Sequence, residues 1–399
     1  MTKTAKVIVV GAGPVGSVAA YRLAEMGVDV ILLEAYPNCP EDLRASTLHP
    51  PTLEMLNEFG IVDDLIDMGL KAPVYQYRNR QSGETFAFDL TELQDMTDYP
   101  YRLQCEQFKL ARLLTGKLQD HPHGEVLFSR RVLSVEQDGS GVTLKVESTR
   151  EIETYRADFV IACDGAGSTV RKWLNVGFEG FTYPEKFVTF STERPLEDYF
   201  DDLALVNYVA DPDEWMVLLR VPSVWRVLVP AHDGNDEFIV SDQKKQEVFK
   251  HLINDPDVVT EHRTIYNVHQ RVADSYFTDR VILAGDSAHL NNPLGGFGMN
   301  SGIHDVFNLT DGLRDVLTTG KGDHIAPLQK YERQRQGVMR AFVQAQTIKN
   351  KKALESRDAD GQKRHQEELT AILADDERRR DYLLGQAMYK SRQLEASID

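Results

Sequence analysis

Three glycines and one acid near the N-terminus have the types and spacing needed to bind a dinucleotide. Gly11, Gly13 and Gly16 lie in GAGPVG, directly after the apolar run Lys6–Val10. In such a turn the first glycine permits the bend, the second lets a pyrophosphate approach the backbone, and the third lets a helix pack on the strand. Glu34 ends the next apolar run, 18 residues after Gly16, where an acid can accept hydrogen bonds from ribose hydroxyls. The pattern predicts a strand–helix–strand unit with the pyrophosphate at the helix N-terminus.

Two acid–glycine pairs follow later in the chain, each directly after a run typical of a buried strand. Asp164-Gly165 stands in CDGAGSTVR, and Gly285-Asp286 stands in LAGDSAH. The first glycine motif alone fits NAD or FAD, so these later motifs carry the distinction between the two.

Together, GAGPVG, CDGAGSTVR and LAGDSAH resemble the three fingerprints of single-component flavoprotein monooxygenases, the para-hydroxybenzoate hydroxylase-like family. Their order and spacing match over roughly Lys6 to Tyr331. Three ordered motifs are far more specific than any one of them. The resemblance implies FAD as the cofactor, one FAD domain without a separate nicotinamide domain, and NADH or NADPH as the co-substrate.

The same resemblance implies roles for single residues. Asp286 would bind the ribityl part of FAD, and Asp164 and Arg171 would serve both FAD and NAD(P)H. Arg44, in LRAST, matches a family arginine near the flavin pyrophosphate. Gln104, in LQCEQF, matches a family glutamine near the flavin chain. For Arg44 and Gln104 an ordinary polar position at the surface is the alternative.

A proline- and glycine-rich loop, HLNNPLGGFGMNSG, follows the third motif and feeds a helix that is predicted to begin near Met299. Pro293, Gly298, Met299 and Asn300 are its candidate site residues. The backbone N–H groups of this loop would face the flavin edge that becomes negative on reduction, where a helix N-terminus is favourable. The family often has a second proline where Asn292 stands, which puts the rigidity of the loop in question.

The chemistry implied by the family is hydroxylation. Reduced flavin reacts with O2 to give a flavin hydroperoxide, which attacks a small phenolic or heteroaromatic ring. The protein must hold that ring, help remove the phenol proton and exclude water. This chemistry needs no metal.

Substrate residues are expected in an inserted sheet. Tyr208 or His232 could relay a proton, and Arg220 could pair with a substrate carboxylate. Tyr183 and Arg226 lie in the same stretch. For each of them, ordinary sheet packing is the competing interpretation. Three further residues are expected to be buried structural ones: Trp215, Trp225 and His289.

The predicted fold class is mixed α/β: a Rossmann-like FAD-binding domain with an inserted, mainly antiparallel β-sheet domain and C-terminal helices. An aromatic-rich stretch of alternating apolar and polar residues, Phe187–Pro230, favours the antiparallel sheet. The charged tail, residues 349–380, is expected to be a solvated helix, with a partner contact as the alternative. The domains are predicted as FAD-binding segments 1–72, 98–180 and 265–355, substrate-binding segments 73–97 and 181–264, and a C-terminal helical segment 356–399.

Composition limits the partners and the compartment. A net charge of −17 argues against nucleic acid and against an anionic membrane surface. Three widely spaced cysteines fit no disulfide framework and no zinc site, which favours a reducing cytoplasm. The uncharged run Val7–Ala20 after Lys3 and Lys6 resembles a secretory signal, but its glycines belong to the nucleotide motif.

Several functions stay open at this stage. The leading prediction is an NAD(P)H- and O2-dependent hydroxylase of a small aromatic compound, favoured by the modest chain length. The alternatives are a flavin dehydrogenase or reductase without productive oxygen use, a monooxygenase of a polyketide or quinone precursor, and a non-catalytic flavin-binding regulator. A homodimer is one option for the assembly.

Overall fold

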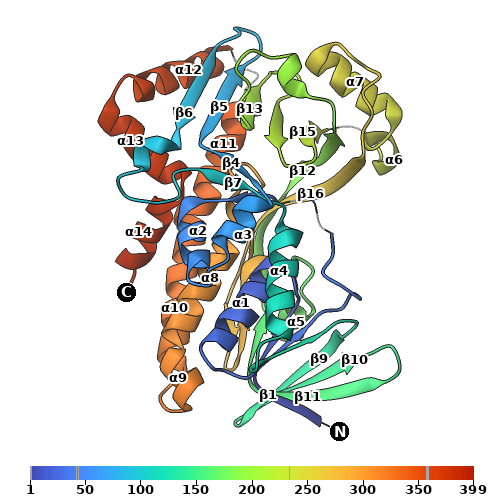
Figure 1. Cartoon of the computed structure of the whole chain (residues 1–399), viewed down its shortest axis with the longest axis vertical. Helices are drawn as coiled ribbons and strands as arrows, with labels where there is room; N and C mark the ends of the chain where they lie inside the picture. Colours follow the sequence, from blue (N-terminus) through green and yellow to red (C-terminus); the bar gives the residue numbers. More distant parts are fainter. Residues whose placement is uncertain (1, 42, 44, 233, 356–358) are drawn as a thin grey trace.

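The structure is a computed structural model and describes residues 2–41, 43, 45–232, 234–355 and 359–399. Figure 1 shows two sheets arranged along the long axis, with the N-terminus beside the lower sheet and the C-terminal helices along one side. The combination of a parallel sheet, a mainly antiparallel sheet and C-terminal helices confirms the predicted fold class.

The first sheet forms around continuous apolar runs. Its central strand β1 (Thr2–Val10) lies parallel to β2 (Val30–Leu33) on one side and to β11 (Ile152–Ala162) on the other. Both faces of β1 are covered, which explains the unbroken apolar run. The order is β17-β18-β11-β1-β2-β8, and β10 and β9 extend from β11. These further strands are β8 (Gly124–Leu127), β9 (Arg131–Asp138), β10 (Gly141–Glu147), β17 (Phe277–Thr278) and β18 (Val281–Leu283).

Helices cover this sheet and bring separate parts of the chain together. Helix α1 (Pro14–Glu25) packs against α4 (Gln107–Gln119) and α8 (Phe297–Gly312), and α8 packs against α10 (Ile325–Val338). The first motif and the loop after the third therefore lie side by side, although almost 300 residues separate them. The short helices nearby are α2 (Pro50–Asn57), α3 (Val62–Asp67), α5 (Thr169–Trp173) and α9 (Arg314–Thr319).

The second sheet has the order β19-β16-β12-β15-β14-β13-β5-β6 and is antiparallel except for the pair β13–β5. Its two faces belong to different cores. Met216 and Leu218 of β14 pack with α7, while Val217, between them, points to the opposite face. The elements are β5 (Val74–Asn79), β6 (Thr85–Asp89), β12 (Phe178–Thr192), β13 (Val206–Ala210), β14 (Met216–Arg220), β15 (Trp225–Ala231), β16 (His262–Ala273), β19 (His289–Leu290), α6 (Asp236–Ile239) and α7 (Asp242–Ile253).

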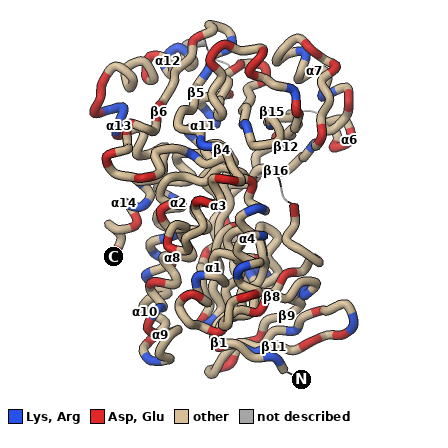
Figure 2. Tube along the Cα trace, in the orientation of Figure 1, with Lys and Arg blue, Asp and Glu red and all other residues tan. Residues whose placement is uncertain are grey.

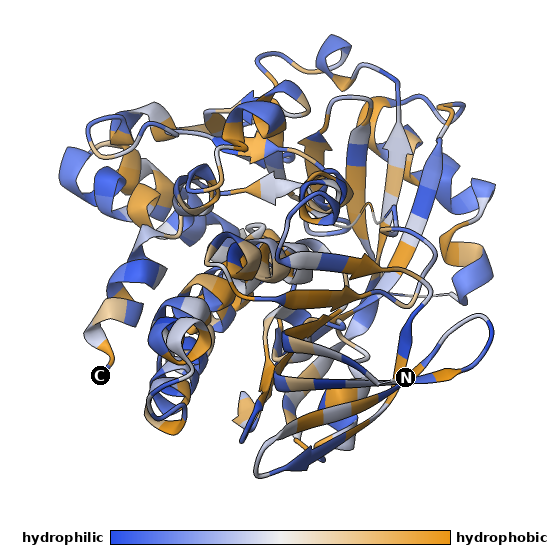
Figure 3. Ribbon diagram, turned by 60° about the horizontal axis from the view of Figure 1, so that its bottom comes forward, coloured by the Kyte–Doolittle hydropathy of each residue, from blue (hydrophilic) through white to orange (hydrophobic). Residues whose placement is uncertain are grey.

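Tryptophans Trp215 and Trp225 are buried in the cores of this sheet, as predicted. Figure 3 shows that the strands inside the molecule are mostly apolar, whereas the outer helices carry many polar residues. The domain boundaries proposed from the sequence stay a prediction.

A small third sheet joins the two large ones. It contains β3 (Thr47–Leu48), β7 (Arg102–Gln104) and β4 (Leu70–Ala72), in the order β3-β7-β4. Short 3-10 turns complete the connections among the described residues: Leu90–Leu93, Leu196–Asp198 and Gly285–Ser287.

The expectation of a solvated helix for residues 349–380 is wrong. Leu354, Leu369 and Ile372 are buried in the core that also contains Tyr75 and Tyr208. Lys, Arg, Asp and Glu residues follow one another along α12 and α13, as Figure 2 shows, so the apolar positions stand among charged ones in the sequence. The C-terminal elements are a π-helical turn (Met339–Gln344), α11 (Ala345–Glu355), α12 (Ala359–Leu373), α13 (Asp376–Gln386) and α14 (Tyr389–Ser397). Within the described part of the chain, no helix combines the length and apolarity needed to cross a membrane.

Candidate active site

One large cavity, of about 690 Å³, lies between the two large sheets. Its nucleotide half is formed by loops at the carboxyl ends of the parallel strands, where open α/β sheets bind ligands. Residues of the nucleotide half include Gly11, Gly13, Glu34, Asp164 and Asp286. Its sheet half is formed by the inner face of the antiparallel sheet, and includes Tyr208, Val217, Leu219, Leu228 and Tyr266.

The three glycines of the first motif do different physical work. A Cβ on Gly16 would lie 1.8 Å from the carbonyl oxygen of Gly11, so only glycine lets α1 pack this closely. Gly11 has φ +97° and lies against Cys163, whereas a Cβ on Gly13 would meet nothing within 4 Å. Gly13 is also the N-cap of α1 and makes no side-chain cap. The first turn of α1 therefore presents backbone N–H groups to the cavity.

Glu34 lines the cavity at the end of β2, as predicted. One carboxylate oxygen accepts the Ala12 N–H at 2.7 Å, and the other accepts the Tyr36 N–H at 3.0 Å. These bonds fix the carboxylate between the first glycine turn and the end of the strand. It is thus held in a set orientation toward a nucleotide in the cavity.

A second helix N-terminus faces the same cavity. Gly296, at φ +71°, is the N-cap of α8 and makes no side-chain cap, and Gly298 and Met299 line the wall beside it. Asn300 does not line the cavity. Its side chain accepts the His49 N–H at 2.9 Å and donates to the Thr47 carbonyl at 2.8 Å. Asn300 therefore fastens the start of α8 to β3.

The loop before α8 is rigid without a second proline. Pro293 lines the cavity, and Asn292 beside it is completely buried. The Asn292 N–H donates to Gln270, its side-chain amide donates to the Thr347 carbonyl, and its side-chain oxygen accepts the Leu294 N–H. These hydrogen bonds hold the backbone where a proline ring otherwise would.

The two acid–glycine motifs meet at one edge of the cavity. Asp164 lines it and accepts the Ser168 hydroxyl at 2.6 Å, and burial raises the pKa of this carboxyl. Asp286 is exposed toward the cavity. Arg171 is not among the lining residues: it donates to the carbonyls of Ser287 and Ala166, both at 2.8 Å. Arg171 thus links the second and third motifs from outside the cavity lining.

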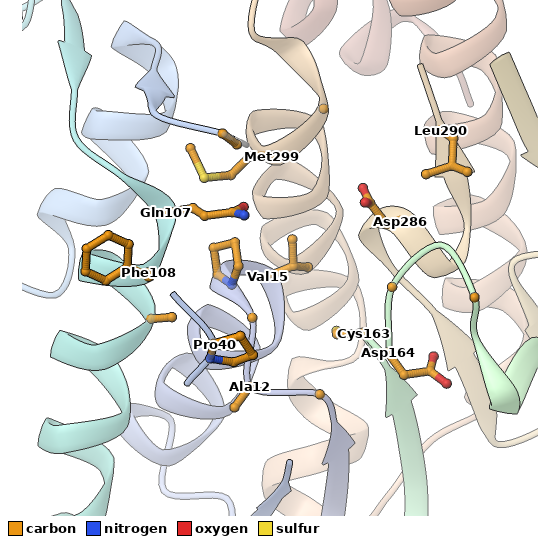
Figure 4. A pocket seen from close by; sticks show the side chains of 18 of the residues that line it. Ala12, Val15, Pro40, Gln107, Phe108, Cys163, Asp164, Asp286, Leu290 and Met299 are labelled. Atoms are coloured by element: carbon orange, nitrogen blue, oxygen red, sulfur yellow. The ribbon is translucent and has the colours of Figure 1, made fainter. Parts of the chain in front are cut away.

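The opposite wall carries a glutamine, but not the one selected from the sequence. Gln104 is fully buried and is not among the lining residues; it accepts the hydroxyl of Thr47, which does line the cavity, at 3.0 Å. Gln107, at the start of α4, lines the cavity together with Phe108. Figure 4 shows both across from Asp164 and Asp286. Arg44 lies outside the described residues.

A buried ion network supports the third motif. His289 is completely buried, as predicted, and its Nε2 lies 2.6 Å from Asp305. Asp305 also accepts the Gly285 N–H at 2.9 Å and the Arg335 Nε–H at 2.6 Å. Burial alone would raise the pKa of Asp305, but His289 and Arg335 hold it down to about 2. Sequence inspection did not find Asp305, because a single acid inside a helix carries no motif.

Of the predicted substrate residues, Tyr208 lies at the cavity and two others do not. Arg220 follows Leu219 on β14 and, since side chains alternate, faces away from the cavity toward Trp225. His232 is exposed after the end of β15 and is absent from the lining. The placement predicted for Arg220 and His232 is therefore wrong. The sequence shows which residues alternate, but not which face of the strand meets the cavity.

The two weaker candidates have structural partners. Tyr183 is half-buried and accepts a hydrogen bond from Asn292 at 3.4 Å. Arg226 is buried and forms an ion pair with Glu106, at 3.9 Å, between the second sheet and α4.

Comparison with known families decides what this cavity serves. The family model described as "FAD binding domain" matches residues 4–346. The chain belongs to this FAD-binding family. Its relatives show that it is an FAD-dependent aromatic monooxygenase, with NAD(P)H as co-substrate.

Two curated relatives share about a third of their residues with this monooxygenase. Para-nitrophenol 4-monooxygenase of Pseudomonas sp. (strain WBC-3) is 34% identical over 326 residues, which cover 79% of each chain. 6-Hydroxy-3-succinoylpyridine 3-monooxygenase of Pseudomonas putida (strain DSM 28022 / S16) is 33% identical, covering 84% of this chain and 86% of the relative.

Solved structures agree with these relatives. The p-nitrophenol 4-monooxygenase PnpA of Pseudomonas putida DLL-E4 has a TM-score of 0.90 and 30% identity, over 96% of this chain and 98% of that one. The flavin-dependent monooxygenase PieE, solved with FAD and substrate, has a TM-score of 0.80 and 25% identity, over 99% of this chain and 72% of that one.

The residues of the nucleotide half fit FAD. Two uncapped helix N-termini, those of α1 and α8, open on one cavity and favour negative groups of the cofactor. The open space over Gly13 leaves room for a pyrophosphate against the backbone. Glu34 and Asp286 provide carboxylate acceptors for hydroxyl groups.

Proposed function

We propose that this monooxygenase hydroxylates a single-ring phenolic or heteroaromatic compound. The observation that carries the proposal is the mixed character of the cavity. Val217, Leu219 and Leu228 form an apolar wall beside the loop that contains Pro293, and Tyr208 and Tyr266 add two tyrosines to the sheet half. A largely apolar wall with few hydroxyls suits a flat ring with few polar substituents. The names of the two curated relatives, a nitrophenol and a hydroxypyridine monooxygenase, support the same substrate class.

In this proposal the nucleotide half holds the cofactor. Gly11 and Gly13 at the N-terminus of α1 would hold the pyrophosphate of FAD, Glu34 would accept from a ribose, and Asp286 would accept from the ribityl chain. Bound there, the cofactor would supply hydride acceptance from NADH or NADPH and activation of O2. In this proposal Asp164 and Gln107, on opposite walls of the cavity, also contact the cofactor.

The chain's own contribution to the reaction is orientation, exclusion of water and control of a proton. The loop from Pro293 to Met299 presents backbone N–H groups at the start of α8, which favour negative charge there. The apolar wall excludes water from the ring. Tyr208 can donate to, or accept from, the substrate oxygen at this wall.

The assembly and the compartment belong to the same proposal. The described cysteines are all unpaired, which is compatible with a reducing cytoplasm. A homodimer is proposed as the assembly, and sedimentation of the FAD-loaded protein tests it.

The decisive experiment measures substrate-dependent turnover. Protein loaded with FAD is given NADH or NADPH with 4-nitrophenol, hydroxypyridines, hydroxybenzoates or a polycyclic phenol. We expect a single-ring compound to stimulate NAD(P)H oxidation. Its hydroxylated product should contain one oxygen atom from labelled O2. Stimulation only by the polycyclic phenol would favour a polyketide substrate. Turnover without incorporation of oxygen by any compound would contradict the proposal.

A further inference from the structure

A buried guanidinium lies directly behind the sheet half of the cavity. Arg102, in β7, is only 1% exposed, and no carboxylate of the described residues forms an ion pair with it. Its Nη1 donates to the Tyr208 hydroxyl at 3.3 Å and its Nη2 donates to the Gln386 carbonyl at 3.4 Å. Its Nε has no partner among those residues. A cation removed from water with two long, neutral acceptors is poorly compensated.

The aromatic residues around Arg102 do not supply the missing charge. The guanidinium lies 4.2 Å from the centre of the Tyr75 ring, and Tyr77 stacks on Tyr208 with ring centres 5.1 Å apart. Burial raises the pKa of both Tyr75 and Tyr77 well above the usual value, so these phenols stay neutral. They attract the cation only through their ring faces.

Tyr208 connects this cation to the cavity. It lines the cavity and accepts a hydrogen bond from Arg102. A hydroxyl that accepts from a cation has its own proton left to donate elsewhere, and the cation strengthens that donation. The neighbouring wall residues Val217, Leu219 and Leu228 are apolar and offer no side-chain acceptor, and Tyr266 of β16 also lines this half.

We propose that Arg102, acting through Tyr208, makes the site select the ionised form of its phenol. This inference rests on the proposed function. Tyr208 donates its O–H to the phenolate oxygen, and Arg102 orients Tyr208 and balances the charge of the bound anion. Arg102 is thus a positioning residue, and its effect is to lower the pKa of the bound phenol. The ionised oxygen makes the ring electron-rich, as an electrophilic hydroxylation requires.

The carbonyl of Gln386 gives the C-terminal region a part in this arrangement. Gln386 is the last residue of α13, and its carbonyl accepts the Nη2–H of Arg102. Helix α13 therefore supplies a second neutral acceptor for the cation.

The test uses 4-nitrophenol as a probe, because only its anion absorbs strongly in the visible range. FAD-loaded protein is saturated with the probe without NAD(P)H, and the difference spectrum is followed against pH. We expect the bound probe to ionise about one pH unit or more below the free probe. Tyr208→Phe and Arg102→Met should abolish this shift, and Arg102→Lys should keep part of it. Tyr77→Phe is the matched control, since it removes a hydroxyl that is not a hydrogen-bond partner of Arg102 and keeps the ring that stacks on Tyr208.

The outcomes separate this inference from the proposed function. A bound probe that ionises as it does in solution, or a shift that persists in Tyr208→Phe, would overturn the role of Arg102. Tyr208→Phe decides the matter even where Arg102→Met fails to fold, because it removes one oxygen and keeps the ring. Failure of 4-nitrophenol to bind also overturns the inference. Other phenols that still stimulate NAD(P)H oxidation would then leave the proposed function standing, whereas no stimulation by any phenol would count against that function itself.

Discussion

The two halves of the cavity differ in which groups form them, backbone groups in one and side chains in the other. In the nucleotide half, backbone groups do most of the work, at glycine turns and at the N-termini of α1 and α8. In the sheet half, side chains on one face of β13, β14 and β15 form the wall. A site made by backbone is fixed by where glycine is required, and a site made by side chains is fixed by which face of a strand is presented. The comparison predicts that substitutions in the two halves damage different measurable properties.

The largest effect is expected at Gly16. In Gly16→Val the side chain would overlap the Gly11 carbonyl, so α1 would have to move away from β1. We expect a loss of at least about 3 kcal/mol of folding stability, together with loss of FAD binding. Gly13→Ala is the matched control, because its Cβ meets no protein atom. It should keep the stability of the apoprotein and weaken only FAD binding, as measured by thermal unfolding and flavin titration. Equal stability losses in both variants would contradict this division.

The next effect concerns acid and arises where the two halves meet. His49 is buried, with Nε2 2.8 Å from the Gly295 carbonyl. Burial first, and then the charge of Arg102, lower the pKa of His49 to about 3. The folded state therefore keeps His49 neutral, while the unfolded chain takes up a proton below about pH 6.5. The stability from this group is fully present above that pH and is lost on acidification, by roughly 1.4 kcal/mol per pH unit, down to about pH 3.

Denaturant unfolding at several pH values measures this effect. His49→Gln can keep a donor near Gly295 and cannot titrate, so its stability should fall less steeply with acid than that of the wild type. His232→Gln is the control, since His232 is exposed and should leave the slope unchanged. Parallel pH profiles for the wild type and His49→Gln would show that His49 does not contribute.

Asp286 tests the nucleotide half without changing its backbone. Asp286→Ala should weaken FAD binding by about 1.5–3 kcal/mol, because a charged acceptor is lost. Asp286→Asn keeps an acceptor oxygen and should lose less. Titration of apoprotein with FAD gives both affinities, and the Michaelis constant for the phenol should stay close to that of the wild type once FAD is saturating. An unchanged affinity in Asp286→Ala would remove this residue from the cofactor site.

The smallest effect is expected from two neighbours on β14. Leu219 lines the cavity and Arg220 does not. Leu219→Ala should raise the Michaelis constant for a small phenol by about 1–2 kcal/mol, or roughly 5- to 30-fold, and leave FAD affinity unchanged. Arg220→Ala should change neither. Steady-state kinetics at saturating FAD compare the two, and an equal effect of both variants would mean that the face of β14 is assigned wrongly.

Much of the nucleotide half could be predicted from the sequence. Gly11, Gly13, Gly16 and Glu34 occupy the places that their spacing indicated, because a dinucleotide turn needs glycine at set positions and an acid at the end of the next strand. The sequence does not distinguish between two neighbouring glutamines. Two lie close together in LQCEQF, and only the start of α4 shows that Gln107, not Gln104, reaches the cavity.

The sheet half shows which structural information an alternating sequence pattern does not contain. The aromatic-rich, alternating stretch indicated an antiparallel sheet, and the strands are there. Alternation divides a strand into two sets of residues but does not say which set meets a ligand, so Tyr208 was placed correctly and Arg220 was not. Arg102 carried no signal at all. It matters because β7, β13 and α13 bring Tyr208, Gln386 and a buried cation together from three distant segments.

By itself, the amino-acid sequence determined the three motifs, their order and hence the family and cofactor of this protein. The need for glycine at a backbone turn is local, so it can be recognised from the sequence without the fold. The tertiary structure alone decided which side chains face the ring, that the charged tail buries an apolar face, and that Arg102 lies behind Tyr208. The physical reason is that burial, facing and charge compensation depend on contacts between segments far apart in the chain, and no local spacing encodes those contacts.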